Sequence, residues 1–187
     1  MRAGGGHAKG AAWEREVGVI LSLWITRGEH RDIFSRNVLS GGAFTVAQKA
    51  GKSTSRSAGD LMAASPLAFR FLERFMVECK HLNHIGLENY LWNSAATSPL
   101  GLIISYAHGQ AEQAGGHYML IAKQNRKPPL VFLRADVGQA ALESPKAGGA
   151  RKRVAPNFHL LHRRRVYLSA LDAFCDYVDP ERFLAKW

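Results

Sequence analysis

The sequence predicts an α/β domain in which a mixed central sheet is flanked by helices. Three observations support this fold class: an amphipathic helix pattern near the start, several separated strand-like runs, and a second helix pattern between two of those runs. Helices and strands that alternate along a chain are typical of a sheet covered by helices. With 187 residues, 47% of them hydrophobic, the chain is long enough for one domain with a substantial core.

The first helix pattern spans residues 8–28. Its apolar residues recur at helical spacing, and they are Trp13, Val17, Ile20, Leu21 and Trp24. A helix turns by about 100° per residue, which places Glu14 at the border of this apolar stripe and Glu16 further toward solvent. A carboxylate at the edge of a buried face makes Glu14 a candidate site residue.

Two short strands and a basic segment follow the helix. Residues 31–42 form a strand-like run that ends in a glycine pair, and a second strand begins near Asp60. Residues 47–60 between them are rich in Gly, Ser, Thr and basic side chains. The Gly51-Lys52-Ser53 triplet lacks the earlier glycine of a phosphate-binding loop, because position 46 is Val. We therefore interpret this segment as a cationic surface loop.

The clearest strand pattern is FMVECKHL, residues 75–82. Alternation along a strand puts Glu78 and Lys80 on one face and Cys79 on the other. Further on, Ser98 followed by Pro99 predicts the start of a helix over residues 100–114, which a pair of glycines ends.

The last third of the chain contains two more strand patterns, at residues 118–125 and 128–135, and then a basic stretch and a short apolar tail at residues 166–178. We expect one domain over residues 1–187. Its core spans residues 8–135, and residues 136–187 form a basic C-terminal extension.

Charge and composition favour a nucleic-acid partner. The formal net charge is +10, which suits a polyanion, and no apolar run approaches the roughly 18 residues needed to span a bilayer. The first ten residues have no apolar core typical of a secretory signal. Only Cys79 and Cys175 are present, too few for a disulfide framework. We expect a cytoplasmic, nucleoid-associated protein that binds DNA and no membrane.

Asp60, Glu78 and Lys80 suggest a specific chemistry. Two neighbouring strands would bring these three side chains to one edge of the sheet. Phosphodiester hydrolysis uses hard oxygen ligands for Mg²⁺, which two carboxylates supply together with substrate phosphate and water. Bound metal lowers the pKa of water and stabilises developing charge, and a nearby ammonium can orient that water.

The order of these residues resembles the PD-(D/E)xK nucleases. Lys9-Gly10 ahead of a helix that carries Glu14 is similar to the opening of the archaeal Holliday-junction resolvases, and Ser40-Gly41 is similar to the pair after their first strand. Residues 22–42 also resemble nuclease-like proteins of phages and mobile elements. The resemblance implies a restriction-endonuclease-like fold and an Mg²⁺-dependent endodeoxyribonuclease, with Mn²⁺ as a substitute, that resolves branched DNA in recombination as a homodimer.

The resemblance also assigns the site. It implies that Asp60 and Glu78 hold the metal, that Lys80 assists the water, and that Glu14 completes the catalytic set directly or through water. Residues with the charge or hydroxyl to contact DNA are Lys9, Ser40, Lys52, Arg151, Lys152, Arg153, Arg163, Arg164 and Arg165.

The sequence departs from the family pattern in three places, and alternatives stay open. Gly59 replaces the Pro of the motif, the loop before it is long and basic, and the compact resolvases lack the segment from Leu130 onward. Glu78 and Lys80 could form an ordinary exposed ion pair, and Gln110 could be an ordinary surface residue of its helix. A zinc site is a further alternative, through Cys79, His81 and His84 and through His159 and His162. The basic surface also allows a nucleic-acid-binding or assembly protein without catalysis.

Overall fold

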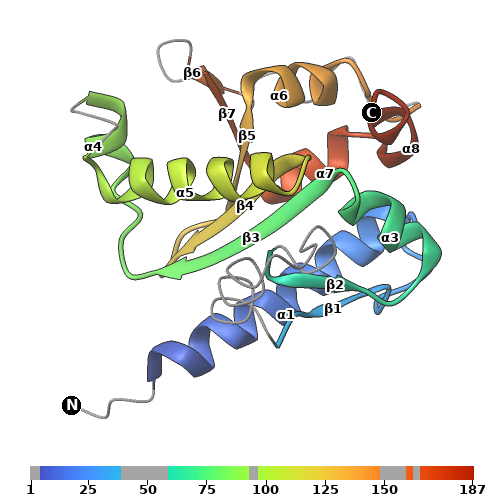
Figure 1. The fold of residues 1–187 in the computed structure, drawn as a ribbon, viewed down its shortest axis with the longest axis horizontal. Coiled ribbons are helices and arrows are strands. Elements are labelled where there is room, and N and C mark those ends of the chain that lie inside the picture. Colours follow the sequence, from blue (N-terminus) through green and yellow to red (C-terminus); the bar gives the residue numbers. More distant parts are fainter. Residues whose placement is uncertain (1–4, 39–58, 93–96, 148–158, 162–164) are drawn as a thin grey trace.

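The structure, a computed structural model, describes residues 5–38, 59–92, 97–147, 159–161 and 165–187 (Figure 1). Its elements along the chain are α1 (Gly5–Ile25), β1 (Phe34–Arg36), β2 (Leu61–Ala63), α3 (Pro66–Leu72), β3 (Phe75–Leu82), α4 (Leu87–Trp92), α5 (Pro99–Gln113), β4 (His117–Gln124), β5 (Leu130–Arg134), α6 (Ala135–Leu142), β6 (His159–Leu161), β7 (Val166–Ala170), α7 (Leu171–Tyr177) and α8 (Pro180–Leu184).

Five strands form one mixed sheet in the order β3-β4-β5-β7-β6. β3 and β4 are parallel, from Phe75 opposite His117 to Leu82 opposite Gln124, and the other neighbouring pairs are antiparallel. A parallel pair needs a crossover connection, which α4 and α5 supply here. β3 is an edge strand, so one of its edges is open to other parts of the chain.

Helices cover both faces of β3. Phe75, Val77 and Cys79 belong to the hydrophobic cluster that includes α1, whereas Met76 belongs to the cluster that includes α5. Figure 1 shows α1 and α5 on opposite sides of this strand. A strand that packs on both faces is buried along its length, and the first five residues of β3 are all buried.

β1 and β2 form a separate antiparallel pair, in which Phe34 lies opposite Ala63. This pair packs against α1. The Ser22 side chain on the helix donates to its own Gly18 carbonyl at 2.7 Å and accepts from the Phe34 backbone N–H at 3.1 Å. The helix thereby fixes the position of the β1 and β2 pair, and Asp60 lies directly before β2.

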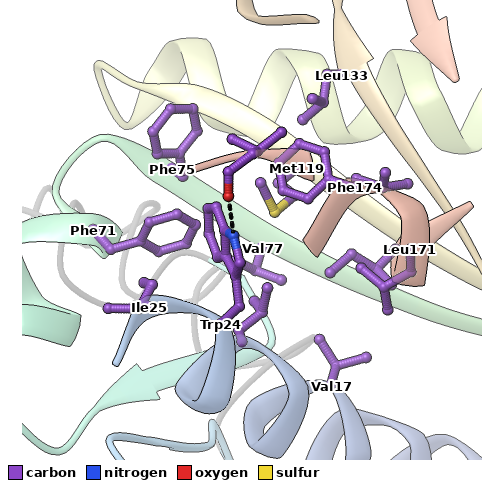
Figure 2. Close-up of a cluster of buried hydrophobic side chains, with 14 of the residues drawn as sticks. Val17, Trp24, Ile25, Phe71, Phe75, Val77, Met119, Leu133, Leu171 and Phe174 are labelled. Carbon is purple, nitrogen blue, oxygen red and sulfur yellow. Dashed lines mark hydrogen bonds between the residues drawn. The ribbon is translucent and has the colours of Figure 1, made fainter. Parts of the chain in front are cut away.

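The core between α1 and the sheet is rich in aromatic rings. Figure 2 shows Trp24 of α1 among these buried side chains, with Phe71 and Phe174 nearby. The Trp24 Nε1–H donates to the carbonyl of Val178 at 2.8 Å. A buried indole needs such a partner for its only polar atom, and this bond ties the first helix to the last part of the chain.

The fold class is confirmed: the chain is an α/β protein with a mixed sheet flanked by helices. The predicted strand at residues 75–82 matches β3, and the predicted helix at residues 100–114 is α5, which begins and ends one residue earlier. Residues 136–187 supply β6 and β7 to the sheet and α7 and α8 to the core. The apolar tail that was predicted as one run divides into β7 and α7.

Among the helices that the structure describes, none combines the length and the hydrophobicity needed to cross a bilayer.

Candidate active site

Asp60 docks on the open edge of β3. Its backbone N–H donates to the carbonyl of Val77 at 2.8 Å, and its carboxylate accepts from the backbone N–H of Cys79 at 2.7 Å. The residue is 7% exposed. These two hydrogen bonds to backbone groups of β3, at Val77 and Cys79, therefore fix both the backbone and the side chain of Asp60.

The residue before it, Gly59, makes this docking possible. Gly59 has φ +90°, and a Cβ atom there would lie 2.6 Å from the carbonyl oxygen of Val77. Such a φ is costly for any residue with a side chain, and proline, with φ fixed near −65°, could not adopt it. The Gly that replaces the Pro of the motif thus matches the local backbone.

Asn37, directly after β1, also stabilises the backbone at Gly59 and Asp60. Its backbone N–H donates to the carbonyl of Asp60 at 2.8 Å, and its side-chain amide donates to the carbonyl of Gly59 at 3.0 Å. Asn37 is 1% exposed. Buried amides are retained where their hydrogen bonds are satisfied, and here those bonds support the residue that presents the Asp60 carboxylate.

Glu78 and Lys80 lie side by side on β3, and the Lys80 ammonium donates a hydrogen bond to the Glu78 carboxylate. Burial, together with the charge of Asp60, raises the pKa of Glu78 above its ordinary value, and Lys80 offsets this only in part. Burial lowers the pKa of Lys80, but the charge and hydrogen bond of Glu78 outweigh this effect and the net pKa is raised. Glu78 is 6% exposed, so an ordinary solvated pair does not describe these residues.

Glu14 reaches the same region from α1. Its half-buried carboxylate accepts from the guanidinium of Arg36, the last residue of β1. The charge of Glu14 also contributes to raising the pKa of Glu78. The structure therefore brings together all four predicted catalytic residues, which come from α1, the position directly before β2 and two alternate positions of β3.

The donor set fits a hard divalent cation. Within the described ranges, no three His, Cys, Asp or Glu side chains converge as a ready metal cluster. The charge of Asp60 acts on the Glu78 carboxyl, so these two carboxylates are the candidate oxygen donors. Mg²⁺ commonly uses only one or two carboxylates and keeps several waters. Burial is the main cause of the raised pKa of Glu78, and the charge of Asp60 adds to it; a bound cation would offset both effects.

The zinc alternative gains no support from the described side chains. Cys79 is buried on the α1 face of β3, and burial raises the pKa of its thiol well above the ordinary value. A thiol that resists ionisation is a poor zinc ligand, because zinc binds the thiolate.

The predicted DNA contacts divide into two groups. The Lys9 ammonium donates to the Asn83 side chain at 3.2 Å, just past the end of β3, and Arg165 is exposed directly before β7. The other predicted contacts lie outside the described residues: Ser40, Lys52, Arg151, Lys152, Arg153, Arg163 and Arg164. Gln110 lies half-buried on α5.

Two residues at the site had no signal in the sequence, Arg36 and Asn37. Arg36 ends a three-residue strand and Asn37 follows it, and an Asn at the end of a strand is common in turns without any further role. Only the packing of the β1 and β2 pair shows that one meets Glu14 and that the other supports the turn at Gly59. Their neighbours are 22 residues away along the chain in each case.

A mixed sheet between helices, with an Asp and a Glu-x-Lys motif at its edge strand, is the arrangement of a PD-(D/E)xK nuclease. The chain belongs to the family described as "Phage putative PDDEXK endonuclease", whose model matches residues 5–183. The superfamily predicted from the order of Asp60, Glu78 and Lys80 is thereby confirmed. None of the curated proteins and none of the solved structures matches the chain.

Proposed function

We propose that this nuclease is an Mg²⁺-dependent DNA endonuclease, and that its closest functional type is a resolvase of branched DNA. The observation that carries the chemistry is the meeting of Asp60, Glu78 and Lys80 at the open edge of β3. Family membership supports cleavage of nucleic acid. The net charge of +10 supports a polyanionic substrate.

Asp60 and Glu78 would hold the cation, Mg²⁺ or Mn²⁺. The bound ion would lower the pKa of a water and offset charge on the phosphate. By strand geometry, the carbonyl of Cys79 points to the same side as its N–H, which bonds Asp60. That carbonyl is a third oxygen on the Asp60 side of the strand.

Lys80 supplies a positive charge at the scissile phosphate. Its pKa is raised, so the ammonium stays protonated at neutral pH. It donates to Glu78 and is about one-third exposed, which leaves donor capacity toward a phosphate or water. Glu14, whose partner is Arg36, would complete the site directly or through water.

The resolvase type also implies an oligomeric state and a cellular location. We propose a homodimer that cuts both strands of a branched substrate during phage recombination, in the cytoplasm and at the nucleoid of the infected cell. The supports are the similarity of the segments around Lys9, Glu14 and Ser40 to junction resolvases, and the phage family.

Plasmid nicking in Mg²⁺ tests the chemistry. We expect Asp60→Asn and Lys80→Ala to lower the cleavage rate by about 10²–10⁴-fold, because each removes a group that acts on the reacting phosphate. DNA binding, measured by fluorescence anisotropy in EDTA, should be kept, and it should tighten for Asp60→Asn because a negative charge near the phosphates is lost.

The matched control is Asp179→Asn. Asp179 is as buried as Asp60, at 7% exposure, but it pairs with Arg27 and caps α8 instead. This variant should lose stability and keep its cleavage rate. Cleavage by Asp60→Asn at the rate of Asp179→Asn would refute the site. A parent protein that binds DNA but nicks in neither Mg²⁺ nor Mn²⁺ would support the non-catalytic alternative.

A further inference from the structure

A polar surface lies where β3 ends and the turn between β4 and β5 begins. We call it the strand-end surface, and it consists of Lys9, Asn83, Asn125, Arg126 and Lys127. Figure 1 shows the connection between β4 and β5 beside the end of β3. Lys80 lies three residues before Asn83, which directly follows β3, so this surface begins about 10 Å from the candidate active site.

Hydrogen bonds between side chains order this surface. The Asn83 carbonyl oxygen accepts from the Lys9 ammonium at 3.2 Å and from the Asn125 amide at 3.1 Å. The Asn125 side-chain oxygen lies 3.2 Å from His81 Nε2. The N-terminal part of α1, the end of β3 and the turn after β4 are therefore held together by side chains that are exposed or half-buried.

Positive charge on this surface is not neutralised. Arg126 and Lys127 are exposed, and in the part of the chain that the structure describes neither makes an ion pair. Lys123, in contrast, pairs with Glu16 at 3.1 Å. Burial and the charges of Lys9 and Lys123 lower the pKa of His81, which is consistent with a positive local potential.

The backbone of Arg126 adds an independent observation. Arg126 has φ +61°, a left-handed conformation that glycine or asparagine adopts at lower cost. Arg27 has a similar φ of +55°, and its guanidinium pairs with Asp179 and Glu181. Among the described residues, Arg126 has no acidic partner that would explain an arginine at such a position. A ligand outside the protein would explain it.

We infer that the strand-end surface binds the phosphate backbone of DNA beside the cut site. The inference rests on the proposed nuclease function for its choice of DNA. A distance of about 10 Å from Lys80 corresponds to about three nucleotides along a duplex. Lys9, Arg126 and Lys127 contact the phosphates, and the two asparagines hold the lysine and the turn in position.

Salt-dependent binding of a fluorescein-labelled duplex, measured in EDTA so that no cutting occurs, tests this inference. Each phosphate contact contributes about 0.9 to the slope of log affinity against log salt. Arg126→Gly and Lys127→Ala should each flatten that slope by about one unit. Arg126→Lys keeps the charge and should keep the slope.

Arg126→Gly has a second expected signature. Glycine relieves the left-handed backbone, so the variant should melt at the same temperature as the parent or higher while it binds DNA more weakly. Arg31→Ala is the matched control, because Arg31 is exposed between α1 and β1, at the other end of the helix, and makes no ion pair among the described residues. It should keep the parental slope.

The outcomes separate this inference from the proposed function. A parental slope for both Arg126→Gly and Lys127→Ala, or an equal flattening by Arg31→Ala, would overturn the strand-end surface whatever the protein cleaves. Flattened slopes in a protein that never nicks DNA would support the surface and refute the nuclease chemistry.

Discussion

The position of Asp60 depends on the residue before it, Gly59. The Asp60 carboxylate is fixed because its backbone bonds to Val77 and its side chain bonds to Cys79. Both bonds require the chain to approach β3 so closely at Gly59 that a Cβ atom would contact backbone. The geometry of a candidate metal ligand thus depends on the absence of a side chain one position earlier.

We predict that Gly59→Ala is strongly destabilising and lowers cleavage. The left-handed backbone alone costs about 1–2 kcal/mol for a residue with a side chain, and displacing β3 or Asp60 adds to this. Gly28→Ala isolates the backbone effect, because Gly28 has a φ of +96° and a Cβ atom there would meet nothing within 4 Å. Urea unfolding of both variants checks the prediction. Equal losses of stability would show that the close approach to Val77 makes no contribution to the free energy of unfolding.

The sequence predicted the positions of those candidate site residues that lie in a regular strand or helix pattern. Alternation along β3 placed Glu78 and Lys80 on one face, and helical spacing placed Glu14 at a stripe border, where it lies half-buried. Arg36 and Asn37 could not be predicted, because their roles depend on how the β1 and β2 pair packs against α1 and on how Asp60 docks on β3. No periodicity within three residues carries that information.

At the scale of elements, the contact between α6 and β7 depends on one small residue. Gly138 of α6 lies so near Tyr167 of β7 that a Cβ atom would lie 2.0 Å from the ring. The Tyr167 hydroxyl donates to the Gln139 side chain at 3.1 Å, which holds the ring against the helix. α6 and β7 can pack at this short separation only because position 138 has no side chain.

Two helical glycines should therefore respond to alanine with opposite signs. Gly138→Ala forces α6 away from Tyr167, and such overpacking typically costs about 1–3 kcal/mol. Gly109→Ala, on α5, meets nothing within 4 Å and should stabilise the protein by up to about 1 kcal/mol through helix propensity. Chemical denaturation of both variants checks the signs. A stabilising Gly138→Ala would contradict the close packing of α6 on β7.

Long elements were predictable from their patterns, and short helices were not. β3 has eight residues of alternation, and α5 has Ser98 as its N-cap, with the side chain accepting from Gly101 N–H at 3.0 Å. α3, α4, α6 and α8 have between five and eight residues, too few turns for a hydrophobic period to show. α3 and α8 do have a local start signal, since Ser65 and Asp179 are N-caps followed by Pro, but a cap without a hydrophobic period does not define a helix.

At the scale of the whole molecule, the net charge of +10 affects how selectivity must be measured. A strongly basic protein binds any duplex tightly at low salt, because counterion release is independent of sequence and shape. Cleavage of several DNA forms at low salt would therefore reveal little about the cognate substrate. The discriminating condition is near-physiological salt, where this general attraction is weaker.

The last prediction concerns substrate and assembly. The proposed metal site of Asp60 and Glu78 would act on any phosphodiester presented to it, so preference must come from how the protein holds the DNA. A four-way junction has two equivalent strands to cut, and a twofold homodimer would present two sites with matching symmetry. We expect paired, symmetric nicks in a synthetic junction and a preference for that junction over linear duplex that persists as salt rises.

A competition cleavage assay at near-physiological salt, with light scattering to give the mass of the cutting species, measures both parts of this expectation. The control substrate is a linear duplex that carries the same sequence as two adjoining arms, so that the two DNAs differ in branching alone. A dimer that nicks the junction in symmetric pairs would support the resolvase type. A monomer that cuts both DNAs at equal rates would refute it, and the nuclease chemistry of Asp60, Glu78 and Lys80 would still stand, because that chemistry requires one phosphate and one site.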